Sequence, residues 1–82
     1  MERGIRKVLQ DMASSWPSEI VSRCEIGAFT GGALKERYCA NLDSAGKGIQ
    51  GRFRIGRKVC YPVNSVIDFL EKRSEKIESK EV

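Results

Sequence analysis

The side chains best suited to chemistry lie in two short stretches of the middle third of the chain. The first stretch holds Lys35, Glu36, Arg37, Tyr38 and Asn41, the second holds Arg52, Arg54, Arg57 and Lys58, and Lys47 lies between them. A guanidinium can pair bidentately with guanine O6 and N7, and an asparagine amide can do so with adenine N6 and N7. Cations spaced along a short strip can bind phosphate oxygens. These residue types favour hydrogen-bonded recognition of a polyanion.

The formal net charge of +4 is unevenly distributed along the chain. Residues 33 to 61 hold seven cations and two anions, residues 1 to 32 hold four of each, and residues 62 to 82 hold four cations and five anions. An excess of positive charge confined to one segment predicts that one face of the protein binds a polyanion. An ordinary solvated surface explains the charge alone equally well. The choice between the two interpretations depends on the structural elements that carry these side chains.

The sequence contains no recognisable catalytic arrangement. The chain has no histidine and no nucleophile beside a base, and Gly46-Lys47-Gly48 is too short for a phosphate-binding loop. Glu36 and Asp43 fall almost two turns apart on one predicted helix and suggest no acid-base pair. We therefore expect neither an enzyme nor a cofactor.

Three cysteines, Cys24, Cys39 and Cys60, stand at spacings of 15 and 21. Without a C-x-x-C pair or a histidine they predict no zinc site, and an odd number predicts no disulfide framework. All three fall in predicted helices or strands. We expect buried thiols in a reducing compartment, with a redox role as the alternative.

The length of 82 residues is enough for one small core. No apolar run approaches the roughly 18 residues that span a bilayer, and the first residues lack the apolar region of a secretory leader. The chain is therefore expected to be a cytoplasmic, single-domain protein.

An amphipathic helix is predicted at the start of the chain, where Ile5, Val8, Leu9 and Met12 follow helical spacing. It should end near Ala13, and Pro17 makes the next residues a connector whose Trp16 packs back on the domain. The apolar stripe either covers the core or pairs with a second copy, and covering the core is the more usual outcome.

Two short helices joined by a glycine turn follow. Ser22 and Glu25 form a capping-box pattern, and Gly31 and Gly32 allow a left-handed turn nine residues later. The second helix should run from 35 to 45. Its predicted core face holds Cys39, Leu42 and Ala45, and its outward face holds Arg37, Ala40, Asn41 and Ser44. The pair predicts a helix-turn-helix, whose second helix can enter the major groove of DNA.

A basic hairpin is predicted next. Phe53, Ile55, Val59 and Tyr61 share one face only if residues 56 to 58 form a three-residue loop, whereas a two-residue turn pairs Ile55 with Lys58. The apolar pattern favours the longer loop. In that register Arg52 and Arg54 project to solvent on the opposite face.

A last helix begins at Pro62, with Val63, Val66, Ile67 and Leu70 as its buried stripe and Phe69 beside it. Beyond Arg73 the charges alternate with few apolar residues, which is typical of a solvated tail. The predicted class is mainly α with a small β-hairpin, in the order of a winged helix-turn-helix.

The segments IVSRCEIGAFTGG, ANLDSAGKG, FRIGRKVCYP and VIDFLEKR resemble the small excisionase-like, MerR-related DNA-binding proteins of prophages and other mobile elements. The resemblance covers about residues 20 to 73. It divides the chain into an N-terminal helix and connector over 1–19, a winged helix-turn-helix DNA-binding domain over 20–73 and a charged tail over 74–82. It also implies cooperative assembly on DNA and a phage integrase as a partner.

The resemblance implies that the second helix reads the major groove through Arg37, Tyr38 and Asn41. It implies that Arg54, Arg57 and Lys58 of the wing touch backbone or the minor groove. Two positions depart from the family pattern. Cys39 stands where relatives tend to carry a larger aliphatic residue, and Glu36 places an anion at the groove-facing end, where it either repels phosphate or accepts a hydrogen bond from cytosine.

Several candidate side chains have a second interpretation. Tyr38 lies toward the core side of the helix, Lys35 reaches backbone phosphate from the helix start, and Lys47 can add a backbone contact. Strand cations such as Arg52 and Arg54 also discourage edge pairing.

Three functions remain open. The first is a prophage excisionase that binds duplex DNA and directs an integrase. The second is a transcriptional regulator of a phage or mobile element with the same surface, and the third is a protein-interaction module without DNA binding. Single-stranded DNA or RNA is a weaker prediction, because the hairpin pattern assigns Phe53 and Tyr61 to the core.

Overall fold

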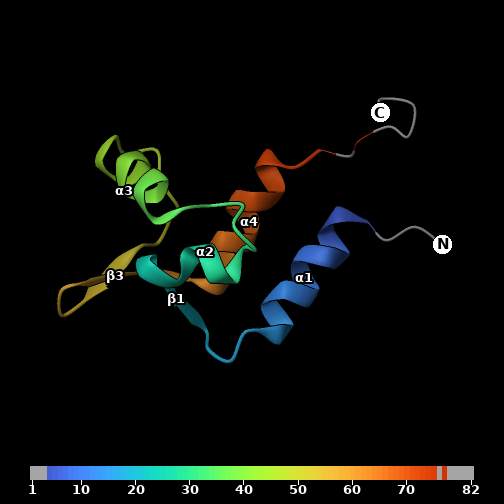
Figure 1. Ribbon diagram of the computed structural model, residues 1–82, viewed down its shortest axis with the longest axis horizontal. Helices are drawn as coiled ribbons and strands as arrows, with labels where there is room; N and C mark the ends of the chain where they lie inside the picture. The colour runs from blue at the N-terminus through green and yellow to red at the C-terminus, as the bar shows by residue number, and fades with distance from the viewer. Residues whose placement is uncertain (1–3, 76, 78–82) are drawn as a thin grey trace.

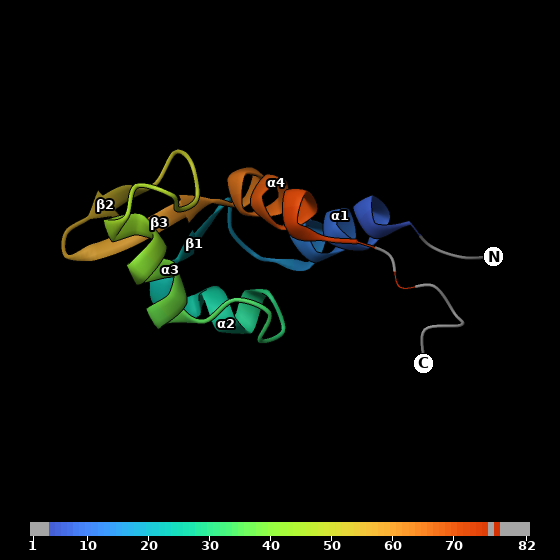
Figure 2. The ribbon, with the colours of Figure 1, turned by 90° about the horizontal axis from the view of Figure 1, so that it is seen from above.

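Three short strands form an antiparallel sheet whose central strand is the second strand of the predicted hairpin. Helices lie at one end of the sheet and on one of its faces (Figures 1 and 2). The computed structural model describes residues 4–75 and 77, which contain four α-helices and one antiparallel sheet. The elements are α1 Ile5–Ser15, β1 Ile20–Ser22, the 3-10 turn η1 Arg23–Glu25, α2 Ile26–Phe29, α3 Glu36–Ser44, β2 Phe53–Ile55, β3 Lys58–Pro62 and α4 Val63–Arg73. No helix within these residues is long and apolar enough to cross a membrane.

The sheet has the order β1-β3-β2, so the central strand is β3. Val21 of β1 lies opposite Tyr61 of β3, and both side chains are fully buried. The strand β1 is absent from the sequence prediction, which treated residues 20 to 22 only as the approach to a helix cap. Three residues are too few to show an alternating pattern, and β1 forms because its neighbours bury Val21 against β3.

The predicted hairpin register is wrong. Ile55 pairs with Lys58 and Phe53 with Cys60, across a two-residue turn at 56 and 57 in which Gly56 has a φ of 60°. Two-residue turns with positive φ match the twist of paired strands. The hairpin extends beyond the helices (Figure 2), so its end has no core against which Phe53 and Ile55 could pack. The apolar pattern therefore did not decide the register.

The register determines what each face of the hairpin carries. Because opposed residues point to the same face, Arg54 shares a face with Val59 and Tyr61. Phe53 and Ile55 lie on the other face with Lys58 and are 42% and 54% exposed. The expectation that Phe53 belongs to the core is wrong, whereas Tyr61 is buried as predicted.

The helices α1 and α4 lie side by side at the end of the molecule far from the hairpin (Figures 1 and 2). The predicted stripe of α4 is buried at all four positions, and Leu9 of α1 joins the same core. Val8 differs from the prediction, since it is 41% exposed, and α1 ends at Ser15 rather than near Ala13. Trp16 packs back as expected, with its Nε1 donating to Ile20 O at 2.9 Å and its ring 5.1 Å from Phe29.

The glycine turn between α2 and α3 has the predicted form. The Ser22 and Glu25 capping box is present, and Gly31 and Gly32 have φ of 65° and 89°. Buried Thr30 completes the turn, because its Oγ1 donates to Ile26 O at 2.8 Å and accepts from the amide of Leu34 at 3.0 Å. The helix α3 is one residue shorter than predicted at each end.

Two side-chain placements differ from the sequence prediction. Ala45, expected on the core face, is exposed beyond the end of α3, and Leu42 is only half-buried, which leaves Cys39 as the buried residue of the helix. Cys39 and Cys60 are buried thiols as expected, whereas Cys24, in η1, is exposed. All three cysteines are free.

The helix α4 ends at Arg73, as predicted. Its last residues are followed by Ser74, whose Oγ donates to Leu70 O at 2.6 Å. Most of the predicted charged tail, residues 76 and 78–82, lies outside the described residues.

Candidate nucleic-acid interface

A buried carboxylate joins α3 to the rest of the domain. Asp43 Oδ2 accepts hydrogen bonds from Arg23 Nη2 and from Tyr61 Oη, each at 2.7 Å, and the Asp43 side chain is 7% exposed. These contacts connect α3 with η1 and with β3. A buried charge is tolerated only when it is paired and hydrogen-bonded, and here both donors come from other elements. The position of α3 relative to the sheet is therefore set by polar contacts as well as by packing.

The charged cluster changes the ionisation of its members. Burial, and then the hydrogen bond to Asp43, raise the pKa of Tyr61 to about 12. The hydrogen bonds to Tyr61 and then to Asp43 raise the pKa of Arg23 above its ordinary value. The phenol therefore stays protonated well above physiological pH and donates its hydrogen bond to the carboxylate.

Arg52 is exposed, as predicted, but its guanidinium also contacts this cluster. Its Nη2 donates to Asp43 O and its Nη1 to Ile49 O, both at 3.3 Å, and its Nε lies 3.8 Å from Asp43 Oδ1. The guanidinium therefore ties the loop after α3 to the start of the hairpin. Gly48, in the loop after α3, has no room for a side chain. A Cβ there would lie 3.1 Å from Asp43 Cα and collide with the Asp43 carboxylate.

Sequence reasoning considered Asp43 only as a catalytic candidate and missed this network. One signal was available. A carboxylate in the last turn of a helix faces the negative end of the helix dipole, which disfavours it locally. Asp43 occupies that position in α3, whose last turn holds no basic residue. Such a residue suggests a tertiary partner, although its identity as Arg23 and Tyr61 required the fold.

The outward face of α3 carries the predicted reading residues. Arg37 and Asn41 are one turn apart and both exposed, and Ala40 between them is half-buried. Within residues 4–75 and 77 neither the Arg37 nor the Asn41 side chain makes a hydrogen bond or an ion pair. Glu36 is exposed in the first turn, and Lys35 is the exposed N-cap residue.

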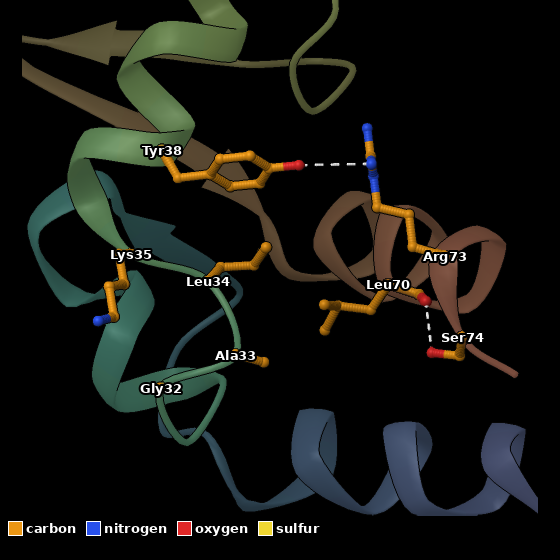
Figure 3. A pocket seen from close by; sticks show the side chains of 8 residues that line it. All are labelled: Gly32, Ala33, Leu34, Lys35, Tyr38, Leu70, Arg73 and Ser74. Carbon is orange, nitrogen blue, oxygen red and sulfur yellow. Dashed lines mark hydrogen bonds between the residues drawn. The ribbon is translucent and has the colours of Figure 1, made fainter. Parts of the chain in front are cut away.

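Tyr38 lies on a different side of α3. Figure 3 shows its ring pointing toward α4, where its hydroxyl accepts a hydrogen bond from Arg73 Nη1 at 3.4 Å. The ring forms one wall of a groove of about 550 Å³ that Leu34, Leu70 and Arg73 also line. The Tyr38 side chain is 43% exposed.

The hairpin cations point in three directions. Arg54 lines a cleft of about 340 Å³ between α3 and the hairpin, together with Ser44 and Arg52. Arg57 is exposed in the turn. Lys58 lies on the opposite face, and its Nζ donates to Cys24 Sγ at 3.9 Å. The cleft brings Arg54 of β2 beside Ser44 at the end of α3, which sequence spacing alone could not place together.

Lys47 is exposed in the loop after α3 and lines a hollow beside α4 with Asp68 and Phe69. It therefore stands apart from the cleft that holds Arg54. Comparison of the chain with protein families, with curated proteins and with solved structures gives no match.

Proposed function

We propose that this chain is a sequence-specific duplex DNA-binding protein with a winged helix-turn-helix. In this proposal α2 and α3 form the helix-turn-helix, α3 is the recognition helix, and the β2–β3 hairpin is the wing. The observation that carries it is that Arg37 and Asn41 of α3, exposed and unpaired within the described residues, and the exposed arginines of the hairpin stand on elements joined by the buried Asp43 network, with Ser44 and Arg54 lining a cleft between these elements. Such a cleft suits the phosphate backbone that separates a major from a minor groove.

Each side chain takes a role that its placement allows. Arg37 reads guanine and Asn41 reads adenine, because both are exposed on one face of α3. Arg54, Arg57 and Lys58 contact phosphates or the minor groove, and Lys35 and Lys47 are backbone contacts at the edges. Arg52 and Asp43 hold the wing against α3, so their effect on binding is indirect.

Two residues of α3 have separate roles in this account. Glu36 stands at the groove-facing end, where it selects cytosine by accepting from its amino group and weakens binding elsewhere by repelling phosphate. Tyr38 points toward α4 and stabilises the domain through Arg73 rather than reading bases.

We place the protein with excisionases that act beside a phage integrase, on the basis of the resemblance of residues 20 to 73 to that class. Self-association on adjacent sites belongs to the same proposal. A transcriptional regulator would use the same surface. Deleting the gene and measuring excision and transcription separately distinguishes the two, because only an excisionase alters recombination directly.

A function of another class, protein interaction without DNA binding, is favoured by the groove between α3 and α4, since apolar side chains dominate its lining. This alternative predicts no dependence of nucleic-acid affinity on salt.

The test is a double substitution of the wing, Arg54→Ala with Arg57→Ala. A matched control, Arg6→Ala with Lys7→Ala, removes the same charge from exposed positions of α1 at the far end of the molecule. We expect the wing variant to lose about tenfold or more in duplex affinity and the control to lose less than about threefold. Equal affinity of the wing variant and the parent protein would refute the proposal.

A further inference from the structure

The hairpin carries two large apolar side chains that the core does not use. Phe53 and Ile55 lie on the same face of β2 and are 42% and 54% exposed. β2 is an edge strand, so its outer side is unpaired within the sheet. Most edge strands carry charges or proline where they meet water, which makes two exposed apolar residues on this one informative.

These side chains stand among cations. Arg54 separates them in sequence, Arg57 follows Ile55 in the turn, and Lys58 is the direct cross-strand partner of Ile55. A purely apolar partner would leave these three charges without a counterion. Duplex DNA offers both requirements, because phosphates line its grooves and the faces of its sugars and bases are apolar.

The spacing of the two apolar side chains along β2 matches the depth of the minor groove. Ile55 is the last residue before the turn, and Phe53 lies two residues farther back, or about 7 Å at the usual rise of a strand. The minor groove is about 7.5 Å deep and about 6 Å wide. Ile55 can therefore reach the base edges while Phe53 stays at the sugars. A hairpin with side chains on both faces is wider than this groove, so it enters only where the groove is opened.

We propose that Ile55 is an apolar wedge that enters the minor groove, partly unstacks one base step and bends the duplex, with Phe53 packed against the sugars beside it. This inference rests on the proposed duplex binding and adds a mechanism of DNA deformation to it. The hairpin turn projects beyond the helices (Figure 2), so it can enter a groove ahead of them. Arg54 then faces one wall, and Lys58 faces the other with Ile55.

The experiment uses duplexes selected from a random pool with the full chain, and then labelled in two ways. One duplex carries fluorophores at its ends to report bending, and the other carries 2-aminopurine in place of an adenine at each pyrimidine-purine step in turn, because these steps unstack most easily. The variants are Ile55→Ser and Phe53→Ser. The control is Val8→Ser, which removes an apolar side chain of similar exposure, 41%, from α1.

We expect the parent protein to bend the duplex and to raise 2-aminopurine fluorescence at one step. Ile55→Ser should abolish the fluorescence change, reduce the bend and lower affinity about tenfold, or about 1.4 kcal/mol, with the salt slope unchanged because no charge is removed. Phe53→Ser should lower affinity less, and Val8→Ser should change neither readout.

Two results would overturn the wedge. If all variants bind and bend the duplex like the parent, the exposed face serves another partner, such as a protein strand added to β2, and the proposed DNA-binding function stands without the wedge. Bending by the parent without any 2-aminopurine change would show that the bend arises from phosphate contacts alone. If the parent shows no salt-dependent duplex binding, the proposed function itself fails, which separates the two outcomes.

Discussion

Asp43 of α3 accepts a hydrogen bond from Tyr61 of β3 at 2.7 Å, which couples the proposed recognition helix to the central strand of the sheet. β3 is also one strand of the hairpin, so the same bond connects α3 to the hairpin. Arg23 and Arg52 contact the same aspartate from η1 and from the start of the hairpin. The cluster acts as one unit, and its energetic contribution can be measured.

Asp43→Asn tests that contribution. The amide keeps the shape of the carboxylate but leaves the half-buried Arg23 without its charge partner, so we expect the free energy of unfolding to fall by about 1 to 3 kcal/mol. Urea denaturation measures it. Asp68→Asn, at an exposed position of α4, is the control and should change stability by less than about 0.5 kcal/mol. An Asp43→Asn protein as stable as the control would show that the network is energetically unimportant.

Alkaline titration tests the same cluster through Tyr61. Its pKa is raised from 10.0 to about 12, so the neutral phenol is favoured by folding. The stabilisation is complete below pH 10, where the tyrosine is protonated in both states, and is lost as pH rises toward 12 because the unfolded chain ionises first. The loss should be roughly 1 to 3 kcal/mol.

Tyr61→Phe isolates this effect from other alkaline titrations. Urea denaturation at several pH values should show the stability difference between parent and variant shrinking, or changing sign, from pH 10 to 12. A difference that stays constant over that range would contradict the assigned burial and hydrogen bond.

Gly48→Ala probes the packing of the loop on Asp43. Even a methyl group would collide with the carboxylate, so the network must open, and we expect a loss of stability of about 2 kcal/mol or more with weaker binding of the wing to DNA. Gly4→Ala, where a Cβ meets nothing within 4 Å, is the matched control and should be nearly neutral. Thermal unfolding compares them, and equal midpoints would refute the close packing of Gly48.

Arg37 and Arg57 should differ in the kind of binding they support. Arg37→Ala should cost about 1 to 3 kcal/mol on the selected site and relax the preference at one base position. Arg57→Ala should weaken binding to all duplexes alike and make the salt slope shallower by about 1. Site selection from a random pool with each variant measures both, and an unchanged selected sequence with Arg37→Ala would remove Arg37 from base reading.

Local patterns predicted much of the fold. The stripe of α4, the Ser22 capping box and the turn at Gly31 and Gly32 all depend on residues within a few positions of each other, and all three are confirmed. Helix periodicity and caps are short-range properties, so one sequence is enough to detect them.

The errors have a long-range cause. The hairpin register was wrong because the apolar pattern was assumed to face a core, whereas the end of the hairpin has none, and Phe53 and Ile55 are exposed. β1 and the Asp43 network were missed because they join residues that lie about 20 to 40 positions apart. The exposed positions of Arg37, Asn41 and Arg57 were predictable, whereas the contact of Arg52 with Asp43 depended on how the loop after α3 folds.

The measurement that tests the central claim most directly is fluorescence anisotropy of labelled random-sequence duplex, single-stranded DNA and RNA across a salt series. If the cations of α3 and the hairpin engage about four to six phosphates, log affinity for the duplex should fall against log salt with a slope of roughly −4 to −5, and the duplex should bind most tightly. Weak affinity without salt dependence for all three probes would contradict the account and favour a protein-interaction module.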